Sequence, residues 1–211
     1  GSGKLKSSLL GEFNLSNLLS VIATACVQGA VLQDCLQVVT TLQAVTGRLE
    51  LISSTIQPQV IVDYAHTPDA LEKALCALKP FCEGNLWLIF GCGGNRDIGK
   101  RKEMGAVASQ YADKVVITND NPRFEAPEKI AQQILEGISC DVEIELDRRR
   151  AIATSIIQAD KQDIVLIAGK GHENYQIIEN SRIAFSDQEE ALAALETAQL
   201  NGSASIEGGI V

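Results

Sequence analysis

The stretch KVVITNDNPR, residues 114–123, predicts the fold more directly than any other part of the chain. Its apolar run VVI consists of β-branched residues, which is typical of a short buried strand. The run ends at Thr118, and the residues NDNP that follow it all disfavour strands. Pro122 has a fixed φ and holds Asn121 in extended backbone, so we expect a stiff polar loop that leads to Arg123. Such a loop suits a charged small molecule, although an ordinary strand-to-helix turn would leave the same pattern.

Apolar runs of similar length recur on both sides of this strand, and amphipathic stretches separate them. Thr67 is the expected N-cap of the first intervening helix, with Pro68 in its first turn. The alternation predicts right-handed crossovers between parallel strands, hence an α/β fold with a mostly parallel (mixed), Rossmann-like sheet covered by helices on both faces. The other expected strands are Gln59–Asp63, Leu86–Phe90, Val142–Glu145 and Ile164–Ala168; helices are expected at 99–111, 127–136, 148–159 and 187–198, and a hairpin at 176–185.

A helical segment precedes this alternation. The residues from Phe13 to about Val45 are rich in Leu, Ala, Val and Gln, and Gly29 marks a break in the expected helix. Asn14 and Ser16 are the candidates for its N-cap. We therefore expect three parts: a helical segment at 1–46, the α/β domain at 47–198 and a mobile tail at 199–211.

Composition limits the classes of function. A chain of 211 residues with 45% apolar residues can bury a substantial core, and its net charge of −9 argues against binding to nucleic acid or anionic membrane. No apolar run approaches the roughly 20 residues that cross a bilayer, and the N-terminus does not have the pattern of a signal peptide. The six cysteines contain no CxxC pair, so we expect a cytoplasmic protein with reduced, buried thiols and no metal site.

Polar residues follow four of the expected strands directly. In open α/β sheets, ligands bind outside the carboxyl ends of the strands. Both histidines, two glycine-rich turns and two arginines fall at such ends: Tyr64–His66, Gly91–Arg96, Asp120–Arg123 and Gly169–Glu173. We therefore predict a ligand site at this edge of the sheet.

The glycine-rich turn GCGGNR, residues 91–96, does not fit a dinucleotide site. The fingerprint of such sites requires a third Gly or Ala where Arg96 stands, which disfavours a small dehydrogenase. Glycines followed by an arginine suit a carboxylate or phosphate instead. Lys100 and Arg101, on the next helix, are interpreted either as part of the site or as solvated surface charges.

The segment GKGHE, residues 169–173, lacks the GK[ST] of a phosphate loop. Glu173 offers a carboxylate to an ammonium group, whereas His172 is interpreted as an anchor of its loop, as is His66. No order of Ser, Cys, His and Asp indicates a nucleophile. Two arginines, an amide and a carboxylate at one edge are complementary to an amino acid that carries more than one carboxylate.

Six motifs in chain order resemble the Mur ligase family: GEFNLSN, GRLE, VDYAHTPDALEKAL, FGCGGNRDIGKR, TNDNPR and AGKGHENYQ. The resemblance covers the chain from about Leu10 to Leu195, and DNPR with GKGHE is its most specific part. Two departures are small: Asn95 stands where Asp is common, and Ile98 where Lys is common.

The resemblance implies the carboxyl-terminal part of a three-domain ligase, with 1–46 as the end of the ATP-binding central domain and 47–198 as the amino-acid-binding domain. It implies a cytoplasmic, ATP-dependent enzyme of peptidoglycan-precursor synthesis that adds meso-diaminopimelate to UDP-MurNAc-L-Ala-D-Glu through an acyl phosphate. The implied cofactors are ATP and Mg²⁺, whose phosphate loop and metal ligands belong to the central domain. We expect a monomer without nucleic acid or membrane insertion, and a chain that is inactive by itself.

The same resemblance implies binding roles for particular residues, whereas the catalytic residues stay unassigned and no metal ligand is expected in this chain. The implied diaminopimelate-binding residues are Arg96, Asp120, Asn121, Pro122, Arg123, Gly169 and Glu173, and the implied ATP-facing residues are Asn17, Arg48, Tyr64 and His66. A stand-alone module that binds an amino acid or nucleotide without catalysis is the alternative.

Overall fold

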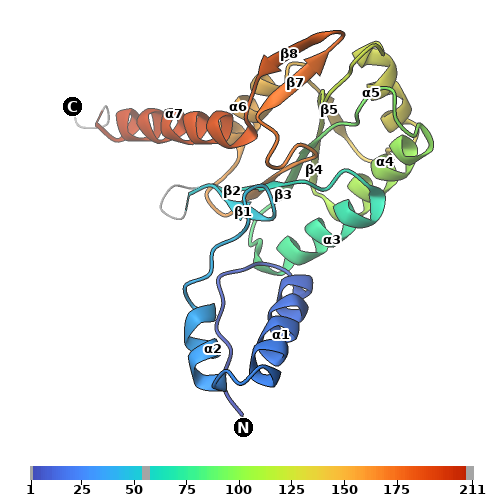
Figure 1. Ribbon diagram of the computed structural model, residues 1–211. Coiled ribbons are helices and arrows are strands. Elements are labelled where there is room, and N and C mark those ends of the chain that lie inside the picture. Colours follow the sequence, from blue (N-terminus) through green and yellow to red (C-terminus); the bar gives the residue numbers. More distant parts are fainter. Residues whose placement is uncertain (1, 54–57, 208–211) are drawn as a thin grey trace. The chain divides into compact units, whose positions relative to one another are not determined.

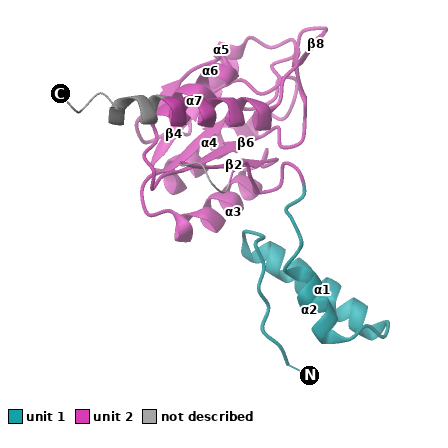
Figure 2. Cartoon of the chain, turned by 90° about the vertical axis from the view of Figure 1, so that its left-hand side faces the viewer, with its two compact units in different colours: residues 1–45 teal, residues 46–211 magenta. Residues whose placement is uncertain are grey.

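The structure is a computed structural model that describes residues 2–53 and 58–207 (Figure 1). The chain divides into two compact units, residues 1–45 and 46–211 (Figure 2). In the first unit, helices α1 (Glu12–Val27) and α2 (Leu32–Val39) pack around a small apolar cluster. Among the described residues, no helix is long and apolar enough to cross a membrane.

The expected break at Gly29 is confirmed, because the chain turns there with φ +100° between α1 and α2. The expectation that Asn14 or Ser16 caps the first helix is wrong. The helix starts earlier, with Gly11 at the N-cap position, and Asn14 Nδ2 donates to Leu10 O at 2.7 Å instead of accepting a backbone N–H. The helical region also ends at Val39 and does not continue to about residue 45.

The second unit contains a six-stranded sheet in the order β1-β2-β6-β3-β4-β5, in which β1 is antiparallel and the other strands are parallel. This confirms the mixed, mostly parallel sheet. The strands are β1 (Glu50–Leu51), β2 (Gln59–Asp63), β3 (Leu86–Phe90), β4 (Lys114–Ile117), β5 (Val142–Ile144) and β6 (Ile164–Ala168), and the expected hairpin is β7 (Tyr175–Ile178) with β8 (Ser181–Ala184).

Helices cover both faces of this sheet, as expected. After β2, β3 and β4 the chain moves in one direction along the sheet, so right-handed crossovers place α3, α4 and α5 on the same face; the return from β5 to β6 places α6 on the other face, where it packs against α7. The helices are α3 (Pro68–Leu78), followed by the 3₁₀ turn Lys79–Phe81, α4 (Gly99–Tyr111), α5 (Pro127–Leu135), α6 (Arg148–Gln158) and α7 (Asp187–Glu207).

Local signals explain several of these elements. Thr67 Oγ1 accepts the backbone N–H of Ala70 and caps α3, as expected. Every residue of β3 and β6 is buried, which accounts for their continuous apolar runs. Side chains of alternate strand residues, such as Ile89 and Ile167, enter one apolar cluster together with Ile156 of α6.

Two expectations about the α/β unit need correction. The final helix does not end at Ala198 but continues to Glu207. Gly202 and the neighbouring serines lower the helix propensity of this segment, but residues of these types do not prevent a helix. The rest of the expected tail, 208–211, lies outside the described residues. The predicted burial of the thiols is confirmed for Cys92 but is wrong for Cys76 and Cys140, which are exposed.

Candidate ligand-binding site

A cavity of about 340 Å³ opens at the carboxyl edge of the sheet. Its lining comes from the loops that follow β2, β3, β4 and β6 and from the start of α4. The lining residues are Tyr64, His66, Gly91, Cys92, Gly93, Arg96, Lys100, Asp120, Asn121, Arg123, Gly169 and Glu173. The four strand ends that the sequence singled out therefore meet at one place.

The glycine-rich loop after β3 lies directly against the loop after β4. A Cβ atom on Gly91 would clash with Thr118 O, and one on Gly94 with Pro122 O. The backbone N–H of Gly94 donates to Asn121 O at 2.9 Å. These two glycines are therefore required for close backbone approach, and the Gly94 amide is already occupied, so it does not supply the anion cradle that glycines at this position suggested.

Arg123 follows the rigid Asn-Pro segment with φ +53°, an uncommon conformation for a non-glycine residue. The hairpin fixes it: the N–H of Arg123 donates to Ile177 O at 3.1 Å, and its carbonyl accepts from Glu179 N–H at 2.8 Å. Its guanidinium lines the cavity and donates to Gly94 O at 3.0 Å. The backbone of Arg123 is thus fixed by hydrogen bonds while its side chain lines the cavity, so Arg123 is not the free tip of a turn.

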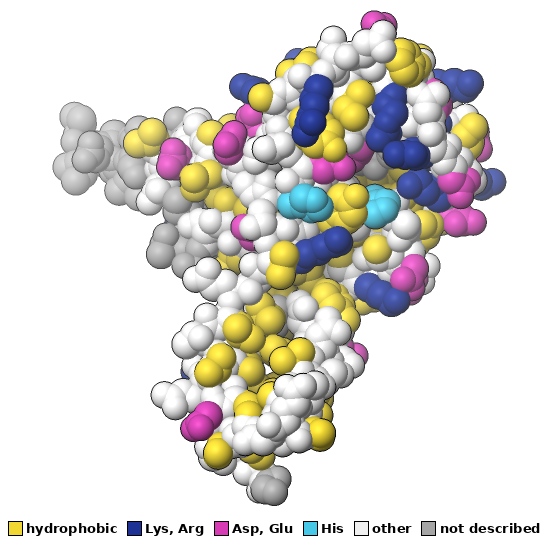
Figure 3. Space-filling view, viewed as in Figure 1, with side chains coloured by type: hydrophobic (Ala, Val, Ile, Leu, Met, Phe, Trp, Pro, Cys, Tyr) yellow, Lys and Arg dark blue, Asp and Glu magenta, His cyan; other side chains and the backbone are white. Residues whose placement is uncertain are grey.

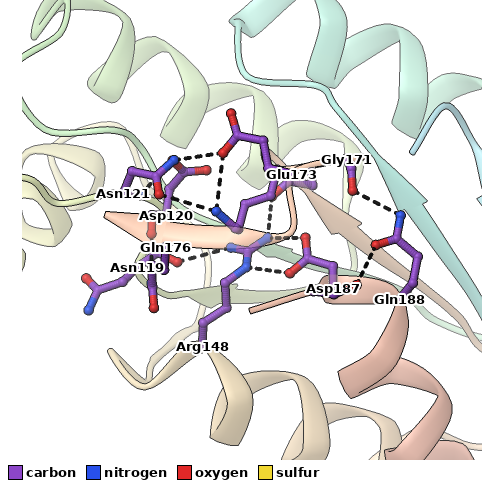
Figure 4. A network of polar contacts seen from close by, with 12 residues as sticks. Asn119, Asp120, Asn121, Arg148, Gly171, Glu173, Gln176, Asp187 and Gln188 are labelled. Carbon is purple, nitrogen blue, oxygen red and sulfur yellow. Dashed lines mark hydrogen bonds and ion pairs between the residues drawn. The ribbon is translucent and has the colours of Figure 1, made fainter. Parts of the chain in front are cut away.

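Asn121 and Glu173 point toward one another across the cavity wall (Figure 4). Asn121 Nδ2 donates to Glu173 Oε2 at 2.9 Å, and Asn121 Oδ1 accepts the N–H of Ile177 at 2.8 Å. Lys170, which is fully buried, lies 3.3 Å from both Asn121 Oδ1 and Glu173 Oε2. Glu173, which the sequence predicts to pair with an ammonium group, therefore also stabilises its own loop.

A buried ion pair lies beneath these loops. Arg148, at the start of α6, donates from Nε and Nη2 to the two carboxylate oxygens of Asp187, both at 2.8 Å, and neither side chain is exposed (Figure 4). Arg148 also donates to Asn119 O at 3.2 Å and to Ala168 O at 3.0 Å. Burial alone would lower the pKa of Arg148, but the carboxylate of Asp187 raises it, so the guanidinium stays charged.

Sequence reasoning missed Arg148, although a signal exists. Arg148 precedes Ala151 and Ile152 by one helical turn, so it belongs to the apolar, buried face of its helix. A cation at such a position requires a partner from another element. The pattern does not show which carboxylate is the partner of Arg148.

Arg101 is not a solvated surface charge, as one interpretation of the sequence held. Its side chain is fully buried and bonds to Glu125 Oε2 at 2.8 Å and to Gly93 O at 3.1 Å. Hydrogen bonding from Arg101, helped by the backbone N–H of Asn95, lowers the pKa of Glu125 to about 2. Lys100 lines the cavity, and its Nζ donates to His66 O at 3.0 Å.

Three of the residues expected to face ATP form a cluster around the ring of Tyr64, and two of them, Tyr64 and His66, line the cavity. The guanidinium of Arg48 lies 4.5 Å from the ring centroid of Tyr64, whose ring is 4.6 Å from that of His66 and 5.3 Å from that of His172. His66 anchors its own loop, since Nδ1 lies 2.8 Å from Tyr64 O. Asn17 belongs to α1 in the first compact unit.

Of the residues expected to bind diaminopimelate, Pro122 is buried beneath its loop, and the others line the cavity. The carboxylates of Asp120 and Glu173 line the same cavity as Arg96 and Arg123. In Figure 3, both histidines lie on one face with Lys, Arg and acidic side chains close by. An open cavity with charges of both signs is suited to a zwitterion with additional carboxylates.

Comparison with known proteins identifies relatives of the α/β unit. Residues 47–171 match the family described as "Mur ligase, glutamate ligase domain". The chain is 50% identical over 198 residues to the UDP-N-acetylmuramoyl-L-alanyl-D-glutamate–2,6-diaminopimelate ligase of Haemophilus influenzae, covering 93% of this chain and 41% of the relative. It is 49% identical over 197 residues to the ligase of the same name from Coxiella burnetii, covering 92% of this chain and 40% of the relative.

Solved structures of Mur ligases are also similar to this chain. A structure of a UDP-N-acetylmuramoyl-L-alanyl-D-glutamate–2,6-diaminopimelate ligase superposes with a TM-score of 0.74 at 42% identity, over 94% of this chain and 41% of that one. The alanine ligase MurC of Thermotoga maritima is similar in fold alone, with a TM-score of 0.69 at 21% identity, over 95% and 41% of the two chains. The chain thus spans about two fifths of the length of the relatives it matches.

Proposed function

The chain belongs to the Mur ligase family, and on this premise we propose that it is the carboxyl-terminal part of an ATP-dependent ligase of peptidoglycan-precursor synthesis. The reaction proposed for the whole protein joins meso-diaminopimelate to UDP-MurNAc-L-Ala-D-Glu. The observation that carries the proposal is the convergence of Asp120, Asn121, Arg123 and Glu173 on one cavity. The relatives named above, at about half identity over nearly the whole chain, support it.

The proposed roles follow from charge. Glu173 and Asp120 attract the ammonium end of the amino acid, while Arg96 and Arg123 bind its carboxylates, with Arg123 assigned to the distal one. Holding the substrate by both ends restricts the position of the amine that attacks, which is the contribution this domain makes to the rate. No side chain of this chain is assigned to a chemical step.

The cluster around Tyr64 fits a nucleotide, since it offers a guanidinium and the two imidazole rings beside an aromatic face. Arg48, Tyr64 and His66 would hold ATP, and we propose Asn17 as a further contact. When bound, ATP supplies the phosphoryl group that activates the D-glutamate γ-carboxylate. We propose that the Mg²⁺ ligands lie in the central domain, whose end would be residues 1–46, and that 47–198 is the amino-acid-binding domain.

We also propose that the whole protein works in the cytoplasm as a monomer, without binding nucleic acid or inserting into membrane. The net charge of −9 supports the first exclusion, because nucleic-acid surfaces in proteins carry positive charge. Sedimentation of the full-length protein would show whether it is a monomer, and the same measurement with added DNA would show whether it binds nucleic acid.

Glu173→Gln in the full-length ligase is expected to raise the KM for diaminopimelate by about 10- to 150-fold, while the KM for ATP stays within about twofold. A hydrogen bond to a charged group contributes roughly 1.5–3 kcal/mol. Because Glu173 also braces Asn121, a melting curve must accompany the kinetics. Glu189→Gln, an exposed change on α7, is the matched control. An unchanged KM for diaminopimelate combined with a lower melting temperature would show that Glu173 has a structural role alone.

The 211-residue chain by itself is expected to fold but neither to hydrolyse ATP nor to form the amide. The sheet and its covering helices are complete within it, whereas it has no GK[ST] phosphate loop. Purified chain and full-length protein should be compared for phosphate release and product formation. Magnesium-dependent ligation by the chain would contradict the domain assignment, and binding of diaminopimelate by a full-length protein without any ligation would favour the stand-alone binding module.

A further inference from the structure

Lys170 is the only lysine with a buried side chain in the part of the chain that the structure describes. It lies two residues beyond the last residue of β6, between Gly169 and Gly171, which have φ +117° and +52°. This left-handed backbone on both sides makes the tight turn that accommodates a long side chain inside the unit. An ammonium group at such a place requires partners that accept hydrogen bonds or carry negative charge.

The partners of Lys170 belong to the candidate site. Its Nζ lies 3.3 Å from Glu173 Oε2, 3.3 Å from Asn121 Oδ1 and 5.5 Å from the ring centroid of Tyr175. Asn121 Nδ2 donates to the same Glu173 oxygen at 2.9 Å, and Ile177 N–H donates to Asn121 Oδ1. These contacts close a triangle in which the Asn121 amide has one orientation. Glu173 and Asn121 line the cavity, whereas Lys170 contacts them from the buried side.

The surroundings of Lys170 set it apart from the other cations of the site. Asp120 and Glu173 line the cavity together with the cations Arg96, Lys100 and Arg123, whereas Lys170 and Arg148 are fully buried. Arg148 already has a bidentate partner in Asp187. Burial lowers the pKa of Lys170, and the charges of Asp120 and Glu173 offset only part of that effect. Lys170 is therefore the buried cation that contacts Glu173, and its hydrogen bond adds to that of Asn121 in fixing the carboxylate.

We propose that Lys170 is a positioning residue for the amino-acid substrate: from the buried side, and together with Asn121, it holds the Glu173 carboxylate in the orientation that faces the ammonium group. The inference rests on the proposed function, since Glu173 is the proposed ammonium partner there. Without Lys170, Glu173 Oε2 would lose the hydrogen bond from Nζ, and the carboxylate would be less restricted in its orientation. A carboxylate that is less well placed pairs less strongly with the ammonium group of the substrate.

The test is Lys170→Met in the full-length ligase, with KM measured for diaminopimelate and for ATP and with kcat measured beside them. We expect the KM for diaminopimelate to exceed that of the parent by about tenfold, the size expected when a hydrogen bond to a charged group is lost in part. The KM for ATP should stay within about twofold of the parent.

Three further variants separate this role from simple stabilisation. Lys170→Arg keeps the charge and the hydrogen-bond donor, and it should keep the parent's KM for diaminopimelate. Ile156→Ala, a truncation in the apolar core, should lower the melting temperature without changing the KM for diaminopimelate. The double variant Lys170→Met/Glu173→Gln should be no worse than Glu173→Gln alone, because the two residues act through one carboxylate.

A deficit of Lys170→Met that raises the KM for ATP as much as the KM for diaminopimelate, or that persists at full size on the Glu173→Gln background, would overturn the inference. If Lys170→Met does not fold, the double variant and Lys170→Arg carry the same comparison. A parent without ligation activity would overturn the proposed function and this inference together. An active parent whose KM for diaminopimelate Lys170→Met matches would overturn this inference alone.

Discussion

Arg123→Ala in the full-length ligase is expected to lower kcat/KM for diaminopimelate by about 30-fold to a few thousand-fold. Truncating one partner of a desolvated charge pair costs roughly 2–5 kcal/mol. Arg123 has the geometry for such a pair: its guanidinium lines the cavity, and its backbone is fixed by hydrogen bonds to Ile177 and Glu179. The fork of a guanidinium offers a carboxylate two parallel donors, which an ammonium cannot reproduce.

Lysine, used as an alternative substrate, tests the role of Arg123 more specifically. It differs from diaminopimelate by one distal carboxylate, so it would leave Arg123 without a partner and should be a poor substrate of the parent. The variant should narrow the preference for diaminopimelate over lysine mainly by losing diaminopimelate. Values of kcat/KM for both amino acids, measured for parent and variant, give the ratio directly.

Two controls separate recognition from backbone effects. Arg123 has a positive φ, so Arg123→Lys, which keeps a side chain and a charge at this strained position, should still lose most of the preference. Arg182→Ala removes an exposed arginine that stacks on Tyr175 in the same hairpin, and it should leave the ratio unchanged. An intact diaminopimelate-to-lysine ratio in Arg123→Ala would show that the arginine merely supports its turn.

Arg148→Met is expected to destabilise the α/β unit by about 3–5 kcal/mol, because it leaves Asp187 buried without its cation. For a domain of this size the loss corresponds to a fall in melting temperature of roughly 6–20 °C. Urea unfolding of the 211-residue chain, followed by the fluorescence of its single tryptophan, Trp87 in β3, reports on this unit.

The neighbouring residue supplies the matched control. Arg149 pairs with Glu190 between the same two helices, but its side chain is 66% exposed. Arg149→Met should therefore cost only about 0–1 kcal/mol. The double variant Arg148→Met/Asp187→Leu should recover part of the stability, since apolar groups can replace a buried pair. Equal effects of Arg148→Met and Arg149→Met would contradict the importance assigned to the buried pair.

Local sequence determined where the strands and most helices lie. Strands β2, β3 and β6 match the expected residues because each is a continuous apolar run bounded by residues that disfavour strands. The place of the cavity followed from the same signals, since parallel strands bring their carboxyl ends to one edge. Cap chemistry was predictable where a side chain decides it, as at Thr67.

Other features were decided by the tertiary structure. Strand β1 has only Glu50 and Leu51, too few for a period to show, and it exists because β2 offers an edge to pair with. The burial of Arg148 depends on the carboxylate of Asp187, 39 residues away in the chain. Lys170 pairs with Glu173 of its own loop, but it also needs Asn121, which is 49 residues away. Charged side chains are exposed by default, and only folding shows which of them have found a partner that offsets the loss of water.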